Sequence, residues 1–390
     1  MQKFKDFTEK FSLSGGSLFT YYACFYMAIS PFTCYITSYY SDIGLSASQI
    51  GLISGIGPLI TIIGQMIWGR MADKAYYKNT VLMIATIGTA VVLYMFTWGK
   101  SYPFLIIMNI LYSFINCSVM QISDSIALEY STAHNLRFST MRMGGSIGYA
   151  VCNIFIGLIL VGHTDRLFMV NIVLIAVSIV SLLFVPKVRG SIDRKNKLQI
   201  TALLKDKKLI ILLIFNFILY LGYFFNMSFY GVMMRSYGAT NLHIGIAQAI
   251  CAFCEVPFLL FSQKIINKIG IKTTLILSTL TFCARWLLYG SLTNVWGLVF
   301  AASLHGTGHI VISYCTASYI NKTVKQSLRA SGQTLLGMVN YGFSKCIATL
   351  VGGVIVDATS LSTVYLSLAC LSVLSGVFLL IFLPKIKEDI

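Results

Sequence analysis

Twelve apolar runs of membrane-spanning length follow one another between residues 17 and 384. A helix of about 20 apolar residues crosses the hydrocarbon core of a bilayer. Hydrophobic residues make up 57% of the chain and charged residues only 11%, whereas a soluble domain is about a quarter charged. The sequence therefore predicts an all-α integral membrane protein, with spans near 17–39, 48–69, 79–98, 102–128, 139–162, 166–186, 208–233, 243–263, 272–291, 295–320, 330–355 and 361–384.

The basic residues lie mostly on one side of these spans. If both termini are cytoplasmic, the cytoplasmic segments hold 23 of the 29 Lys and Arg residues, and the opposite side holds only Lys100, Arg166 and Arg235. This positive-inside pattern fixes the orientation and explains the net charge of +16. We expect a plasma membrane of the bacterial inner-membrane type, contact with lipid, and no nucleic-acid partner.

The cysteines indicate neither a disulfide framework nor a metal centre. All ten fall within predicted spans, and Cys251 and Cys254 form the one close pair. No second pair accompanies them, so small apolar side chains in packed helices are the better interpretation. No nucleophile–base set, metal cluster or phosphate loop is evident either. We therefore expect no enzyme, no metal and no cofactor.

The chain resembles two distant copies of one unit. Placing Ile50-Gly51 over Ile244-Gly245 also aligns Lys74 with Lys268 and Lys78 with Lys272. A similar offset aligns Leu136-Arg137, Gly145 and Tyr149 with Leu328-Arg329, Gly337 and Tyr341. Parallel repeats of six helices are one known transporter architecture. We expect a half at 1–187, a basic cytoplasmic linker at 188–207 and a second half at 208–390.

Six ionisable residues interrupt the apolar runs. An ionisable group in hydrocarbon costs several kcal/mol, so it faces a bundle interior or a water-filled path and has a partner. Six of them predict a polar chamber and the transport of a polar solute: Asp124, Arg142, Glu255, Arg285, His305 and Lys345.

A short motif follows the second predicted span. Gly69-Arg70-Met71-Ala72-Asp73-Lys74 combines a glycine, which permits a tight turn, with a carboxylate that can pair with cations or a helix end. It resembles the signature of the major facilitator superfamily in the loop between spans 2 and 3. That resemblance implies a fold of two six-helix halves that alternate access to a site near the midplane, with Gly69, Asp73 and Lys74 acting in the conformational change.

Within that superfamily the chain resembles the lactose permease–like branch of oligosaccharide, nucleoside and phenylpropionate proton symporters. Ile265-Ile266-Asn267-Lys268-Ile269-Gly270 resembles the loop after span 8 of the permease. In that register Arg285 and His305 fall on its arginine of span 9 and its histidine of span 10. Phe343-Ser344-Lys345 falls on its lysine of span 11. The resemblance thus implies proton-coupling roles for Arg285, His305 and Lys345.

The same branch implies a solute site in the first half. Arg142 and Tyr149 match its substrate arginine and the aromatic residue that stacks on the sugar, and Asp124 matches its substrate glutamate. A carboxylate and a guanidinium can hydrogen-bond sugar hydroxyls or a ribose in a fixed geometry. The alternative is a structural ion pair that joins two helices.

The chain lacks several acidic residues of this branch, so another residue must carry the proton. Gly308 replaces a coupling glutamate of the permease, and Asn216 and Asn226 are the only amides where span 7 of the permease has aspartates. Glu255 is then the best remaining acid, because a moving Arg285 can switch its protonation. The alternative is a permanent Glu255–Arg285 pair.

Three further interpretations stay open. His305 and His309 lie on one helix face, but no third metal ligand is evident. We expect a histidine that binds solute or relays a proton. For His309, the alternative is a side chain that only packs, with its hydrogen bonds satisfied. Lys345 has no acid in its own span or in span 7, so it can pair with Glu255, be neutral, or meet an anionic solute. The surplus of cations favours a carboxylate solute or a bound anion. Tyr22 and Tyr220 can stack on a sugar, base or phenyl ring, or simply pack.

The sequence thus predicts a monomeric symporter that imports a small polar organic solute, such as a sugar or nucleoside, together with protons as the coupling ion. The alternatives are a carrier of an aromatic or other carboxylate, an uncoupled facilitator, a drug exporter, or a membrane sensor that does not transport.

Overall fold

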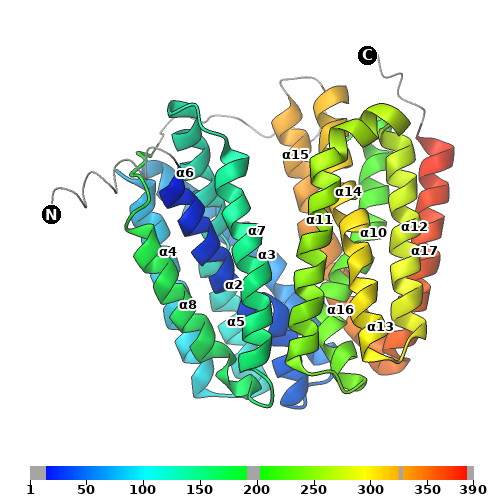
Figure 1. Ribbon diagram of the computed structural model, residues 1–390, viewed down its shortest axis with the longest axis horizontal. Coiled ribbons are helices and arrows are strands. Elements are labelled where there is room, and N and C mark those ends of the chain that lie inside the picture. Colours follow the sequence, from blue (N-terminus) through cyan, green and yellow to red (C-terminus); the bar gives the residue numbers. More distant parts are fainter. Residues whose placement is uncertain (1–14, 191–202, 325–327, 384–390) are drawn as a thin grey trace. The chain divides into compact units, whose positions relative to one another are not determined.

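The computed structural model describes residues 15–190, 203–324 and 328–383, and every regular element in these ranges is helical (Figure 1). Within these ranges, eleven helical segments are long and apolar enough to cross a membrane. Helix α2, Gly16–Asp42, adds a twelfth of sufficient length, although its many Tyr, Thr and Ser residues lower its hydropathy. The predicted all-α fold of about twelve spans is confirmed.

The helices group into two compact units. The first holds Met1–Leu45, Leu59–Lys195 and Thr240–Gly245, and the second holds Ser46–Pro58, Asn196–Ala239 and Ile246–Ile390. Two helices, α3 (Ala47–Lys74) and α11 (Asn241–Ile269), therefore begin in one unit and continue in the other. The other helices of the first unit are α2, α4 (Lys78–Met95), α5 (Tyr102–Asn116), α6 (Val119–Ala133), α7 (Phe138–Ile159) and α8 (Leu167–Leu182).

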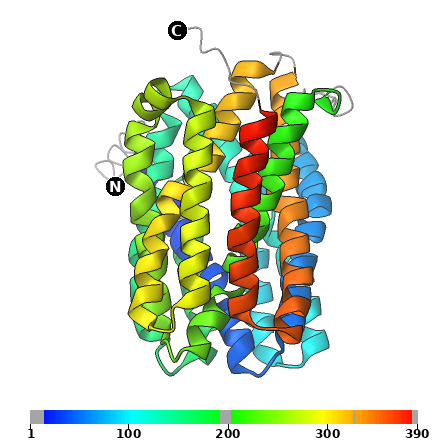
Figure 2. The same cartoon turned by 90° about the vertical axis from the view of Figure 1, so that its right-hand side faces the viewer.

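Several helices of the second unit are interrupted by 3-10 or π-helical turns. In it, α12 packs against α14 and α17, and Figure 2 shows α12 and α17 side by side. Large apolar residues face outward in both units, such as Leu183, 69% exposed, and Leu260, 73% exposed, which suits helices surrounded by lipid. Its other helices are α10 (Lys207–Ser236), α12 (Ile271–Ser291), α13 (Val295–Ala301), α14 (His305–Thr323), α15 (Arg329–Gly337), the π-helix η5 (Met338–Ser344), α16 (Lys345–Ala358) and α17 (Leu361–Phe382).

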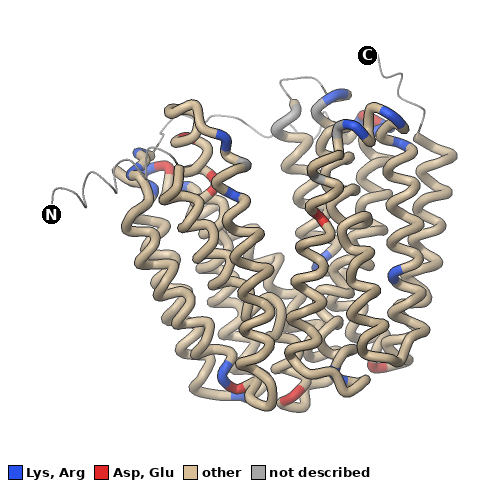
Figure 3. Tube along the Cα trace, viewed as in Figure 1, with Lys and Arg blue, Asp and Glu red and all other residues tan. Residues whose placement is uncertain are grey.

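Charged residues lie mainly at helix ends, and few lie midway along the helices (Figure 3). Helix α3 ends at Lys74 where α4 begins at Lys78, and α11 ends after Lys268 where α12 begins near Lys272. The few charges midway along the helices are the residues that a membrane makes costly.

Each of four midspan ionisable residues lies beside an irregular stretch of helix. Asp124 follows the break between α5 and α6, and Glu255 is two residues before Pro257 inside α11. His305 follows a 3-10 turn, Ala302–Leu304, and Lys345 follows η5. Irregular backbone inside a membrane needs other partners for the freed polar groups. At the first break, the Trp68 indole nitrogen donates to the Phe114 carbonyl oxygen at 2.8 Å.

The motif Gly69–Lys74 is helical, which corrects the expectation of a tight turn at Gly69. Helix α3 continues to Lys74, and the chain turns only at Ala75–Tyr77. The space around Gly69 is open, since an added Cβ would meet nothing within 4 Å. The glycine is therefore not required by a turn, because a helix needs no positive φ.

Close glycine contacts hold α14 against α11. A Cβ added at Gly306 would lie 1.8 Å from the Cys254 carbonyl oxygen, next to Glu255. We expect Gly306→Ala to destabilise the fold by about 2 to 3 kcal/mol, because backbone must move to make room. Thermal melting in detergent measures the effect. Gly337→Ala is the matched control, since a Cβ there meets nothing within 4 Å; equal melting temperatures for the two variants would contradict the close packing.

Asp357 caps the N-terminus of α3 from the end of α16, and both contacts lie within the second unit. Its Oδ1 accepts from the Ala47 N–H at 3.0 Å, and its Oδ2 accepts from the Ser48 N–H at 2.8 Å. A carboxylate there satisfies two free N–H groups and suits the helix dipole. We expect Asp357→Ala to destabilise the protein by about 1 kcal/mol in thermal melting. Asp165→Ala, which removes an exposed acid, should melt like the wild type, and an unchanged Asp357→Ala would exclude the cap.

Candidate solute and proton sites

The first unit brings Asp124 and Arg142 together as an ion pair. Nη1 of Arg142 donates to both carboxylate oxygens of Asp124, at 2.7 and 2.6 Å. The side chains are 34% exposed for Arg142 and 26% for Asp124, so the pair is open to a solute. One guanidinium nitrogen of Arg142 serves both oxygens of Asp124. The other N–H donors of the guanidinium have no hydrogen-bond acceptor among the described residues. The pair can therefore bind a solute without being broken.

Tyrosines of α2 hold this pair in place. The buried Tyr22 donates from its hydroxyl to Asp124 Oδ1 at 2.6 Å. Tyr21 shares a 2.8 Å hydrogen bond with Ser123, and the Arg142 guanidinium lies 5.9 Å from the centre of the Tyr26 ring. Tyr22 is fully buried, which suits a residue that positions Asp124 better than one that stacks on a solute.

Tyr149 lies elsewhere along α7. Its hydroxyl is 2.9 Å from Cys34 Sγ, and its side chain is partly buried. The structure thus joins Asp124, Arg142 and Tyr22 directly, while Tyr149 contacts α2 at another level. A ring that is partly exposed can still offer a stacking face.

The second unit links Arg285, His305 and Glu255 in a row. Arg285 Nη1 is 2.9 Å from His305 Nδ1, and His305 Nε2 is 3.1 Å from Glu255 Oε1. Arg285 also donates to the Tyr289 hydroxyl and packs against the Trp286 ring. In this arrangement Arg285 reaches Glu255 through His305, and the alternative of a direct Glu255–Arg285 pair is not what the structure shows.

This row fixes the tautomer of His305. A guanidinium can only donate, so His305 Nδ1 must accept. Its Nε2 therefore carries the proton and donates to Glu255. His305 is neutral in this arrangement, because a second proton on Nδ1 would point at the Arg285 donor. A shift of Arg285 would free Nδ1, and that in turn would change the hydrogen bond at Glu255.

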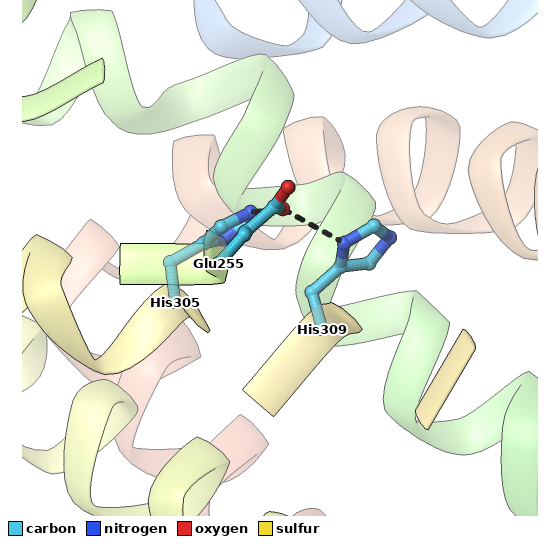
Figure 4. A group of neighbouring side chains, drawn as sticks. All are labelled: Glu255, His305 and His309. Atoms are coloured by element: carbon cyan, nitrogen blue, oxygen red, sulfur yellow. Dashed lines mark hydrogen bonds and ion pairs between the residues drawn. The ribbon is translucent and has the colours of Figure 1, made fainter. Parts of the chain in front are cut away.

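His309 joins Glu255 and His305 in a compact group (Figure 4). One potential metal-ligand atom of each residue lies within 4.8 Å of those of the other two, and His309 Nδ1 is 3.7 Å from Glu255 Oε1. Sequence reasoning found no third metal ligand here; Glu255, on another helix, supplies one. Two histidines and a carboxylate can bind zinc. The Arg285 contact disfavours it, because His305 then offers a proton to the group and not a lone pair.

The interpretation that His309 only packs, with its hydrogen bonds satisfied, is wrong. Both of its ring nitrogens are buried and have no hydrogen-bond partner among the described residues. The ring stacks on Tyr223 at 4.1 Å between centroids and lies 5.7 Å from Tyr220. A buried polar group without a partner needs one from a ligand or water.

Lys78 and Glu129 form an ion pair that sequence reasoning missed. Lys78 is only 2% exposed and also donates to Ser125 Oγ at 2.9 Å. Both residues lie one position outside the predicted spans 79–98 and 102–128, where a charge is expected to face water. The spacing of Ser125 and Glu129 by one helical turn was the available signal.

Comparison with known proteins identifies the family. Residues 16–367 match the model of the MFS_1-like family. The chain belongs to that family. The expected resemblance to the major facilitator superfamily is thereby confirmed, and it covers almost all of the described chain.

Relatives of this family are similar over most of their length. The chain is 26% identical over 352 residues to the uncharacterized transporter YwbF of Bacillus subtilis, covering 88% of this chain and 87% of the relative. It is 23% identical over 343 residues to a maltose permease of Geobacillus stearothermophilus, covering 87% of each. The crystal structure of the nucleoside transporter NupG matches with a TM-score of 0.83 at 19% identity, over 95% of this chain and 99% of that one. The last match shows the fold.

Proposed function

We propose that this protein is a proton-coupled symporter that imports a small polar organic solute such as a sugar or nucleoside. The observation that carries the proposal is the row Arg285–His305–Glu255, an arginine, a neutral histidine and an acid inside membrane-spanning helices. Similarity to permeases of maltose, sucrose and nucleosides supports the solute class.

In the coupling step that we propose, Glu255 binds the proton. His305 donates to the carboxylate while Arg285 holds Nδ1, which stabilises the unprotonated acid. If Arg285 moves away during the conformational change, His305 can turn or change tautomer, and the partly buried Glu255 then takes up a proton to avoid an unpaired charge. The arginine thereby links protonation to conformation.

The solute contacts that we propose lie at Asp124 and Arg142. A sugar or ribose offers vicinal hydroxyls, which can donate to the carboxylate and accept from the free guanidinium donors. Tyr22 positions Asp124, and the partly exposed Tyr149 offers a ring face. Tyr220, which the sequence also predicted to stack on a solute, is fully buried and instead packs among other aromatic rings of the second unit. We propose further that the two six-helix halves alternate access, that Gly69, Asp73 and Lys74 act in this change, and that the termini are cytoplasmic in an inner membrane. The protein then needs no cofactor, acts as a monomer, and is not an enzyme.

The test is the external pH of a lightly buffered suspension of energy-depleted cells that express the protein. Sugars, nucleosides and carboxylates are added in turn. Transient alkalinisation with one class is the expected result. Entry of labelled solute without a pH change would leave a facilitator; efflux would indicate an exporter, and binding without flux a sensor.

A further inference from the structure

Lys345 is a midspan cation without an acidic partner among the described residues. Its side chain is partly buried at the start of α16, within the span Ser331–Ala358. No described carboxylate lies within the 4.0 Å of an ion pair, and its Nζ lies 5.7 Å from the centroid of the Phe224 ring. An ammonium away from water is costly unless something compensates its charge.

The backbone before Lys345 is built in an unusual way. The π-helix η5, Met338–Ser344, ends directly before it. The Ser344 hydroxyl donates to the Val339 carbonyl at 2.9 Å and lies 3.3 Å from the Phe217 carbonyl, whereas the buried Asn340 Oδ1 of the same turn has no hydrogen-bond partner among the described residues. Short π-helical segments are rare and occur frequently at functional sites, where they redirect a side chain. Here the segment places Lys345 against α10.

An aromatic wall connects Lys345 with the Glu255 group. The ring of Tyr220 lies 6.1 Å from Phe224, 5.8 Å from Tyr341 and 5.7 Å from His309. One end of the wall therefore carries a cation, and the other end carries the unsatisfied nitrogens of His309. Tyr220 and Phe224 are buried within this wall, and Tyr341 is 50% exposed. A ligand with an anionic group for Lys345 and a ring-shaped body against Tyr341 would suit the cation end of the wall.

The charge balance of the second unit agrees with such a ligand. Away from the helix ends, its described membrane-spanning residues include two cations, Arg285 and Lys345, and one acid, Glu255. His305 is neutral because of its tautomer. One positive charge is left over, and Lys345 is the cation of the two that touches no other ionisable group among the described residues.

We propose that Lys345 binds a carboxylate of the transported solute, so that the preferred substrates are sugars, nucleosides or similar bodies that carry an acid group. This inference rests on the proposed function, because it refines the solute that the protein carries. A carboxylate makes charge-assisted hydrogen bonds with an ammonium. Bonds of that kind correspond to about a ten- to hundredfold preference over a neutral analogue.

The experiment compares pairs of solutes that keep their rings and differ at one carboxylate: glucuronate with glucose, galacturonate with galactose, and orotidine with uridine. Binding to the purified protein in detergent is measured by calorimetry, and uptake is measured in proteoliposomes. The variants are Lys345→Gln and Lys345→Arg, with Lys322→Gln, an exposed lysine near the end of α14, as the control. Thermal melting checks that each variant is folded.

We expect at least one acid to bind about tenfold or more tightly than its neutral partner. Lys345→Gln should lose that preference, while Lys345→Arg and Lys322→Gln retain it. Equal or weaker binding of the acid in all three pairs would overturn the inference, as would a preference that survives in Lys345→Gln. If Lys345→Gln does not fold, Lys345→Arg provides the test, because arginine keeps the positive charge. Loss of the preference for the acid in Lys345→Arg would then contradict the inference. Selective binding of an acid without flux would instead overturn the proposed transport and leave the anion site standing.

Discussion

Replacing Glu255 with glutamine is expected to abolish accumulation of solute while leaving exchange intact. Glutamine has the shape of glutamate and still accepts the hydrogen bond from His305 Nε2, which is 3.1 Å from Oε1 in the structure. It cannot take up a proton, so a proton gradient can no longer drive uptake. Exchange of internal for external labelled solute needs no net proton movement, and we expect it to continue within about twofold of the wild-type rate.

The exchange reaction is the internal control for Glu255→Gln. It shows in the same membranes that the variant is folded and binds solute. Loss of both reactions would make Glu255 a structural or solute-binding residue. Unchanged accumulation would remove it from the coupling mechanism altogether.

Arg142→Lys is expected to lower kcat/KM for uptake by about a hundredfold or more. Lysine keeps the positive charge beside Asp124, but it lacks the remaining planar donors that Arg142 holds free. Each charge-assisted hydrogen bond to a solute is worth about 1.5 to 3 kcal/mol, so two lost bonds exceed a factor of a hundred. Initial rates of labelled uptake over a range of solute concentrations measure the change.

A matched substitution separates this effect from a general loss of arginine. Arg235, at the end of α10, donates from Nη1 to the Ala239 carbonyl at 3.0 Å, and lysine can make that bond as well. Arg235→Lys should therefore retain most of the activity. If Arg142→Lys did so too, the Asp124–Arg142 pair would be a structural contact between α6 and α7.

The spans were predictable because their signal is simple. Hydrophobic length alone predicts α12 and α17 to within two residues at their ends, since the bilayer demands it. It fails at the end of α3, where Arg70, Asp73 and Lys74 remain helical outside the apolar run. Polar residues continue a helix readily once it is started, so composition marks the apolar run and not the end of the helix.

The site was predictable in its residues and not in its contacts. The cost of charge in hydrocarbon singled out Glu255, Arg285 and His305, but their order as a row depends on how α11, α12 and α14 pack. The contacts of His309 with Tyr220, Tyr223 and Glu255 depend on the same helix packing and could not be predicted from the sequence. The π-helix before Lys345 left no trace in the residue pattern, because a π-helical turn has no characteristic spacing of apolar residues over so short a segment.

The most direct test of proton coupling is uptake by purified protein in proteoliposomes under an imposed pH gradient. The solute is the one that causes alkalinisation in cells. With an inward gradient of about one pH unit and one proton per solute, we expect accumulation of up to about tenfold, because one pH unit equals about 1.4 kcal/mol. A protonophore should collapse it. Uptake that only equilibrates the solute across the membrane, with or without the gradient, would show that the protein does not couple transport to protons.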